Sequence, residues 1–299
     1  MAETTLTAPA PAPEPAPARG LRRRSAAARA ALARSVLLHV VIVIGALAMF
    51  FPFYWTIVTS LTPGTGLSST PSLVPSDPGF DAYRQLFADL PFARIVGNSL
   101  LLATITTLAQ LVTSATAAYA FSRLPFRGRT VVFGIYLATM MIPLQVLVVP
   151  LFAELRAWGL VDTYLGALLP TLAAAFGVFL LRQAMNQVPF ELDEAAAIDG
   201  AGHFRIFWTV VLPNIRPALA TLAVFAFMGS WNNFLWPLVV LRSPELQTLP
   251  VALAGLQGQY TTQWDVVMAG SVVSILPMLA IYLFAQKYVI QGVANTGLK

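Results

Sequence analysis

The sequence predicts an all-α membrane protein with six transmembrane helices. Hydrophobic residues make up 57% of the 299-residue chain, charged residues make up 10%, and the mean hydropathy is +0.72. A soluble domain carries about 25% charged residues. Six stretches free of Asp, Glu, Lys and Arg each have the length of roughly 20 residues that crosses a bilayer core. They are too long and too continuously apolar for barrel strands, which alternate over about 10 residues.

Each stretch is expected to be a helix, because a helix satisfies its own backbone hydrogen bonds in lipid. A charge at a helix centre costs roughly 2.5–3.5 kcal/mol on insertion scales, so charged residues mark the ends of the spans. The expected spans are residues 35–60, about 95–122, 130–153, 163–181, 218–241 and 266–286. Residues 35–299 are expected to form one six-helix membrane domain. Residues 1–34 are expected to form a disordered, basic tail rich in Ala and Pro.

The first apolar run is predicted to stay in the mature chain. It continues through Val58, past the roughly 7–15 apolar residues of a cleaved signal peptide.

The basic residues predict the orientation in the membrane. If the N-terminus is cytoplasmic, only four of the 18 Lys and Arg residues lie outside the cell: Arg84, Arg94, Arg156 and Arg242. Because cytoplasmic loops carry an excess of positive residues, both termini and the loop at residues 189–217 are predicted to be cytoplasmic. The net charge of +5 reflects this topology and does not indicate nucleic-acid binding, since the basic residues are spread over loops that flank spans.

The longest outside connection is residues 61–91. It begins with a segment rich in Pro and Gly and continues into residues 80–87, which are expected to form a short helix at the membrane interface. The loop is either a plain connection with an aromatic anchor or a surface for an extracytoplasmic partner.

The sequence predicts no catalytic, cofactor-binding or metal site. There is no cysteine, and the only lysines, Lys287 and Lys299, do not belong to a GxxxxGK[ST] motif. The two histidines, His39 and His203, have no HExxH spacing. The expected spans contain no Asp, Glu, Lys or Arg, which disfavours a transporter driven by an ion gradient. Energy for transport is therefore expected from another chain.

The loop at residues 189–217 is the most strongly patterned polar segment. Glu191, Asp193 and Glu194 lie where a short helix is expected to begin, and Gly200 lies where it is expected to end. A second helix is expected from four apolar residues at helical spacing before Pro213: Phe204, Phe207, Trp208 and Val211. The pattern indicates a hinged pair of helices that docks a partner. The alternative is an ordinary interfacial loop with solvated acids and a membrane-resting aromatic face.

A second polar segment lies about halfway along the fifth expected span. It reads Ser230-Trp231-Asn232-Asn233 and continues to Pro237. These groups either hydrogen-bond between helices or line a route for polyhydroxylated solutes, which offer hydroxyls to amides and ring faces to aromatics.

Four segments resemble a known family. Glu194-Ala195-Ala196, followed by Gly200 and by Val210-x-Leu212-Pro213, resembles the EAA loop of ABC importer permeases. Further segments are similar to the carbohydrate branch, in particular the smaller permease of maltose-type importers: Asn98-Ser99-Leu100, Leu180-Leu181-Arg182-Gln183 and residues 231–238. The resemblance covers about residues 35–299. The chain departs from it at Asn232-Asn233, where the family commonly has Asn-Asp, and at its C-terminus, which lacks Lys-Gly.

The resemblance implies a type I (MetI-like) permease fold in the bacterial inner membrane. It implies a heterodimer with a second permease, a cytoplasmic ABC ATPase dimer that supplies energy, an extracytoplasmic solute-binding protein, and a carbohydrate or polyol solute. The expected ATPase contact comprises Glu194, Ala195, Ala196, Asp199, Gly200, Phe204, Leu212 and Pro213, with Phe204 and Leu212 as buttresses. The possible solute pathway comprises Ser230, Trp231, Asn232 and Asn233. An ion-coupled carrier and a non-transporting scaffold remain as alternatives.

Overall fold

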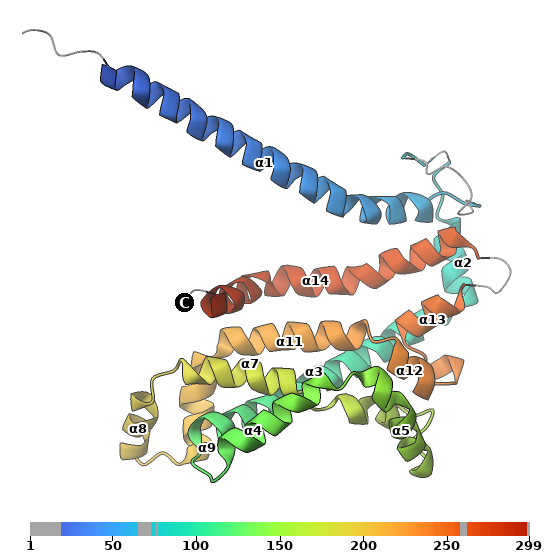
Figure 1. The fold of residues 1–299 in the computed structure, drawn as a ribbon. Coiled ribbons are helices and arrows are strands. Elements are labelled where there is room, and N and C mark those ends of the chain that lie inside the picture. The colour runs from blue at the N-terminus through green and yellow to red at the C-terminus, as the bar shows by residue number, and fades with distance from the viewer. Residues whose placement is uncertain (1–18, 65–72, 76, 258–261, 298–299) are drawn as a thin grey trace, which may run out of the picture. The chain divides into compact units, whose positions relative to one another are not determined.

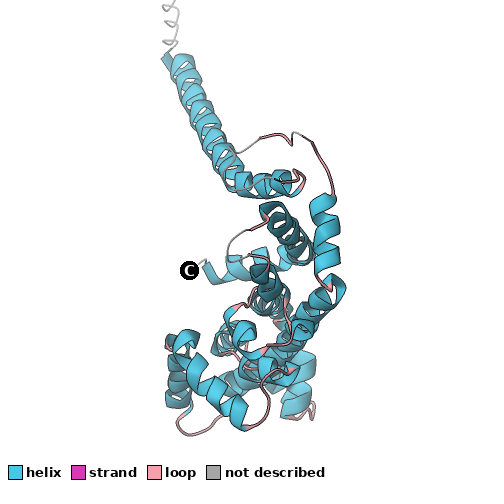
Figure 2. Ribbon diagram, turned by 90° about the vertical axis from the view of Figure 1, so that its right-hand side faces the viewer, coloured by secondary structure: helices cyan, strands magenta, loops and turns pink. Residues whose placement is uncertain are grey.

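The computed structural model describes residues 19–64, 73–75, 77–257 and 262–297. This part of the chain is helical apart from its loops and one isolated bridge between Gln257 and Thr262 (Figure 2). It divides into two compact units, Met1–Trp55 and Thr56–Lys299. The predicted all-α class is confirmed for the described residues.

Most of the first unit belongs to helix α1, Arg19–Ser60. Residues 19–34 were expected to belong to the disordered tail, whereas the helix starts at Arg19. Ala and Arg fill much of this segment and are strong helix formers, which favours an extension of the helix beyond the apolar run. The Ala/Pro stretch within residues 1–18 lies outside the described residues. The side chains from Ala31 to Tyr54 are exposed, and Trp55 at the end of this unit is half-buried.

The second unit holds a bundle of helices with short helical segments at both ends (Figure 1). Its elements are α2 (Asp81–Asp89), α3 (Phe92–Arg123), α4 (Arg129–Ala138), η1 (Thr139–Met141), α5 (Leu144–Ala157), α6 (Tyr164–Leu168), η2 (Leu169–Thr171), α7 (Ala175–Asn186), α8 (Glu191–Ile198), α9 (His203–Ile206), the π-helix η3 (Phe207–Val211), α10 (Leu212–Asn214), α11 (Arg216–Trp231), α12 (Leu235–Val240), η4 (Pro244–Leu246), α13 (Leu249–Gly255) and α14 (Trp264–Gly297).

Three helices have the length and apolar composition of a membrane span: Ala31–Ser60 of α1, α3, and Trp264–Phe284 of α14. Three pairs of helices qualify only when the members of each pair are taken together. Their members meet at 96° for α4–η1 with α5, 44° for α6–η2 with α7, and 81° for His203–Asn214 with α11. Length and composition therefore give three spans, or six if each bent pair crosses once.

The fifth expected span, residues 218–241, is not one continuous helix. Helix α11 ends at Trp231 and α12 begins at Leu235. Pro237 has no N–H to donate to the carbonyl four residues earlier, so the sequence cannot maintain unbroken helical hydrogen bonding through this segment. The expected span at residues 218–241 therefore consists of two helices joined at a break.

The break between η2 and α7 is stabilised by polar side chains of α3. Gln110 Nε2 donates to the carbonyl of Thr171 at 2.7 Å, and Thr113 Oγ1 donates to the carbonyl of Leu172 at 3.1 Å. A carbonyl freed by a helix break needs such a partner when water is excluded. Gln110 and Thr113, although they lie in an apolar helix, thus serve as hydrogen-bond donors to the carbonyls at this break.

Helix α3 is the central element of the second unit, because it packs against both α7 and α11. Gly177 of α7 lies so close to Ser114 of α3 that a Cβ at Gly177 would overlap the Ser114 hydroxyl. Helices α8 and α9 lie at one end of this bundle, and α2, α12 and α13 lie at the opposite end (Figure 1).

Candidate functional site

The first helix of the 189–217 loop has clear sequence signals at both ends. Three acidic residues occupy the first turn of α8, where the partial positive charge of the helix dipole favours them. At its other end Gly200 adopts a left-handed backbone with φ of +83°, and Ala201 N–H donates to the Ala196 carbonyl at 2.9 Å. A Cβ built on Gly200 would meet no atom within 4 Å. Within this chain, glycine is therefore required here by backbone conformation and not by a close contact.

The predicted contact residues divide into exposed and half-buried groups. Five are exposed: Glu194, Ala195, Asp199, Gly200 and Phe204. Three are half-buried, Ala196, Leu212 and Pro213, and of these Ala196 and Leu212 pack against the buried core. Large apolar side chains lie among the exposed residues, with Ile198 87% exposed and Phe204 78% exposed. An exposed surface that combines small, acidic and large apolar groups has the character of a contact surface for another protein.

The second half of the loop differs from the expected regular helix. It consists of the single turn α9, the π-helix η3 and the short α10. Phe207 and Val211 are buried, whereas Phe204 and Trp208 face outward. A π-helix has more residues per turn than an α-helix, so faces assigned at a spacing of 3.6 residues do not hold across it. Phe204 therefore does not buttress the loop as expected, and Phe207 occupies that role.

A buried ion pair attaches α8 to the end of α3. Arg123 Nε lies 2.8 Å from Asp193 Oδ2, and the two side chains are only 6% and 8% exposed. Arg123 also donates from Nη2 to the Val188 carbonyl at 2.8 Å and lies over the Phe190 ring at 5.6 Å. Burial raises the pKa of Asp193, while the charges of Arg123 and His203 oppose that rise.

The sequence predicts Asp193 only as a favourable charge at a helix start, and Arg123 only as one of the basic residues on the cytoplasmic side. No spacing rule relates two residues 70 positions apart, since the pair forms only when α8 folds back onto α3.

The second half of the loop is attached to α3 one turn earlier. The hydroxyl of Tyr119 donates to the His203 carbonyl at 3.2 Å. The Tyr119 ring contacts the Phe207 ring edge-on, with 5.1 Å between the ring centroids. The last turns of α3 therefore contact both halves of the loop.

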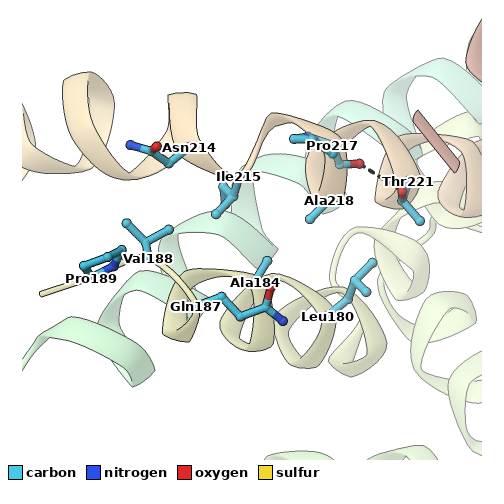
Figure 3. Close-up of a pocket in the computed structure, with 10 residues that line it drawn as sticks. All are labelled: Leu180, Ala184, Gln187, Val188, Pro189, Asn214, Ile215, Pro217, Ala218 and Thr221. Carbon is cyan, nitrogen blue, oxygen red and sulfur yellow. Dashed lines mark hydrogen bonds between the residues drawn. The ribbon is translucent and has the colours of Figure 1, made fainter. Parts of the chain in front are cut away.

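A pocket of about 270 Å³ separates the two segments that lead into and out of the loop (Figure 3). Leu180 and Ala184 of α7 and Gln187 directly after it line one side, and Asn214 and Thr221 belong to the other. The Thr221 hydroxyl is occupied by a bond to the Pro217 carbonyl at 2.9 Å. The segments that lead into and out of the loop thus leave a small cavity between them.

The 230–237 segment provides fewer accessible side chains than the sequence suggested. Trp231 is 2% exposed, donates from Nε1 to the Ser274 carbonyl at 3.2 Å and stacks on Phe227. Trp236 is also buried and donates to the Gly166 carbonyl at 3.3 Å. Both indoles therefore hold helices together, and Trp231 does not line an open route. Asn232 is exposed, while Ser230 and Asn233 are half-buried.

The other end of α3 carries a second polar attachment. Asn98 Nδ2 donates to the carbonyls of Glu245 and Gln247 at 2.9 and 3.0 Å, and its Oδ1 accepts from the Tyr164 hydroxyl at 2.7 Å. Ser99 Oγ accepts from the Leu249 N–H at 2.7 Å.

The segment held by Asn98 and Ser99 also has a cap at its start. The carboxylate of Asp162 accepts from the backbone N–H of Arg242 and Ser243 and from the Ser243 hydroxyl. The Ser243 bonds hold the pKa of Asp162 below its usual value.

Comparison with known proteins assigns the family. Residues 110–295 match the model of the binding-protein-dependent transport system inner membrane component. The chain belongs to this family. It is 37% identical to the arabinooligosaccharides transport system permease protein AraQ of Bacillus subtilis (strain 168), over 85% of this chain and 92% of that protein. It is 31% identical to the lactose transport system permease protein LacG of Rhizobium radiobacter, over 86% and 93% of the two chains.

Solved structures agree with this assignment. A chain of a bacterial ABC transporter involved in the import of the acidic polysaccharide alginate superposes with a TM-score of 0.77 at 27% identity, covering 87% of this chain and 98% of that one. A chain of the methionine ABC transporter MetNI, at 16% identity and a TM-score of 0.51, shares the fold over 67% of this chain and 95% of that one. The chain is therefore an inner-membrane permease component with the type I importer fold. The predicted permease class is confirmed, and the carrier and scaffold alternatives are not favoured.

Proposed function

We propose that this permease forms, with a second permease subunit, the route by which an ATP-driven importer moves a carbohydrate or polyol across the inner membrane. Its relatives are named for arabinooligosaccharides, lactose, starch degradation products and sn-glycerol-3-phosphate, all of which are polyhydroxylated or derived from polyols. A soluble binding protein delivers the solute from outside the cell, and a pair of ABC ATPase chains supplies the energy.

In this proposal the chain crosses the membrane six times. The spans are α1, α3 and α14, the bent pairs α4–η1 with α5 and α6–η2 with α7, and α11, whose bent partner His203–Asn214 lies in the cytoplasm. Both termini and the 189–217 loop lie in the cytoplasm. The distribution of Arg and Lys supports this sidedness, because only four basic residues fall on the opposite side.

The 189–217 loop is the proposed contact with the ATPase. The observation that carries this proposal is that Glu194, Ala195, Asp199 and Gly200 form an exposed turn while Asp193 beneath them is buried in an ion pair. Small side chains allow a partner to approach closely, and the buried attachment lets a force on the loop move the bundle. Asn232 is the proposed solute contact of the fifth span, because it is the exposed amide of that segment.

A substitution that adds bulk without backbone strain tests the ATPase contact. Ala195→Trp enlarges an exposed helical position in the loop, and we expect the complex purified through this permease to lose its ATPase chains and its solute uptake. Gly200→Trp tests the same surface but also strains a backbone with φ of +83°. Ala157→Trp, at the exposed last position of α5, is the matched control and is expected to retain both. Normal ATPase recovery and uptake in Ala195→Trp would refute the contact.

A further inference from the structure

We infer that α3 mechanically couples the 189–217 loop to the 241–249 segment across the membrane. Tyr119 and Arg123 are the positioning residues at one end of α3, and Asn98 and Ser99 are those at the other. The inference rests on the proposed function and adds to it the route of communication within this subunit. It assigns to α3 a role that its place as a central packing helix does not require.

The attachment of α3 to the loop is specific and largely shielded from water. Arg123 pairs with Asp193 of α8, and Tyr119 binds the His203 carbonyl at the start of α9. The two contacts come from adjacent turns of one helix and hold the two halves of the loop. A displacement of the loop therefore displaces the end of α3 unless these contacts break.

The attachment at the opposite end is equally specific. Asn98 and Ser99 are buried, and together they bind three backbone groups, those of Glu245, Gln247 and Leu249. Side chains that bind backbone groups fix the path of a segment whatever the identity of its own side chains. Residues 241–249 are therefore expected to move together with α3.

The part of α3 between the two attachments is suited to pass a displacement of one end to the other. Residues 98 and 123 both lie within α3, and 25 residues at 1.5 Å each place them about 37 Å apart along the helix. Unlike the bent pairs around it, α3 is continuous over its 32 residues and contains no proline. A helix of this kind moves as a rigid element, whereas the bent pairs have breaks at which movement is lost.

The chain that leads from the loop through α11 and α12 to residues 241–249 is a less direct connection than α3. A pocket of about 270 Å³ lies between α7 and the α10–α11 corner next to the loop, although α7 and α11 pack against each other in the rest of the bundle (Figure 3). Helix α11 is also interrupted after Trp231, before the chain reaches the 241–249 segment. Helix α3 therefore connects the two ends with fewer interruptions than the chain that joins them covalently.

A double-mutant cycle on the complete importer tests the inference. The readout is the fold stimulation of ATP hydrolysis by solute-loaded binding protein, relative to the basal rate of the same preparation. The loop-end variant is Tyr119→Phe with Arg123→Lys, which keeps the ring and the charge but removes the Tyr119 hydroxyl and the Arg123 guanidinium. The opposite-end variant is Asn98→Ala with Ser99→Ala. Arg84→Gln, which removes the exposed ion pair with Asp81, is the control.

Each variant is expected to lose stimulation by about fivefold or more, the usual scale of coupling between sites. Distant and independent changes normally add in free energy. If α3 is the shared route, the combined variant instead loses no more than the worse of the two. Stimulation that falls by the product of the separate losses, or that is unchanged in either variant, overturns the inference. The control is expected to match the unmodified complex.

Two further measurements keep the result interpretable. If the loop-end variant does not assemble, Arg123→Gln with Asp193→Asn removes both charges together and leaves no unpaired buried ion. If the unmodified permease carries no ATPase, the proposed function fails. If the ATPase is present and Ala195→Trp releases it, but the α3 variants couple normally, only this inference fails.

Discussion

The 189–217 loop and the 230–237 segment are two polar regions that stand out in the sequence. They differ in the exposure of their side chains. The loop presents Glu194, Ala195 and Asp199 outward and anchors itself through the buried Asp193. The 230–237 segment turns both of its tryptophans inward and leaves Asn232 exposed. The difference teaches that a polar cluster in an apolar chain marks either a contact with another molecule or a joint within the fold. Only burial separates the two cases.

The largest expected effect concerns the anchor of the loop. Asp193→Ala leaves the Arg123 guanidinium buried without its counter-ion, and we expect a loss of about 3–5 kcal/mol in the free energy of unfolding. Thermal unfolding of the purified permease in detergent measures it. Asp81→Ala breaks an ion pair whose side chains are 79% and 64% exposed, so it is expected to cost about 1 kcal/mol or less. Equal losses in the two variants would remove the distinction between anchor and surface.

A smaller effect is expected at the joint in the 230–237 segment. Trp231→Phe keeps an aromatic ring against Phe227 but removes the bond from Nε1 to the Ser274 carbonyl. The expected cost is about 1 kcal/mol of stability, the usual net value of one hydrogen bond. Solute affinity for uptake is expected to stay unchanged in the folded fraction, because the indole does not face a route. A changed solute preference with full stability would instead return Trp231 to the pathway.

Its neighbour Asn232 is expected to behave in the reverse way. Asn232→Ala removes an exposed amide, so stability is expected to change by about 0.5 kcal/mol or less. Uptake is expected to show a raised KM for the solute, since one hydrogen-bonding group is lost from the proposed route. Radiolabelled solute uptake in proteoliposomes that contain the whole importer measures this, with Ala157→Trp as the neutral control. An unchanged KM would count against Asn232 as a solute contact.

The smallest expected effect is on the pH dependence of stability, where two carboxylates should act with opposite sign. The pKa of Asp193 is raised by burial, so the folded state holds its proton more strongly than the unfolded chain. Its contribution to stability therefore falls as the pH rises from the ordinary value of 3.8 through the raised pKa. The pKa of Asp162 is lowered by its bonds to Ser243 and Arg242, so its contribution is present above 3.8 and is lost as the pH falls through the lowered value.

The two slopes are measured by subtraction. The difference in unfolding midpoint between the unmodified permease and Asp193→Asn, followed across the acidic range, isolates the first contribution. Asp162→Asn isolates the second. Differences of the same sign would contradict the assigned causes of the two shifts.

The sequence by itself determined the solvent of this protein, the approximate limits of its apolar stretches and the position of the patterned loop. Charge is so costly in lipid that its absence marks the apolar stretches, and the acidic start and Gly200 end of α8 are local signals. The resemblance of Glu194-Ala195-Ala196 and Gly200 to the EAA loop was equally local, and it led to the family that the comparisons confirm.

Only the tertiary structure decided which residues of each region meet. Arg123 and Asp193 lie on separate helices, as do Asn98 and the 245–249 backbone, and no periodicity relates them. The π-helix in the loop and the interruption after Trp231 also changed which side chains face inward. Burial and long-range pairing depend on where helices pack against each other, so a pattern read along one helix cannot contain them.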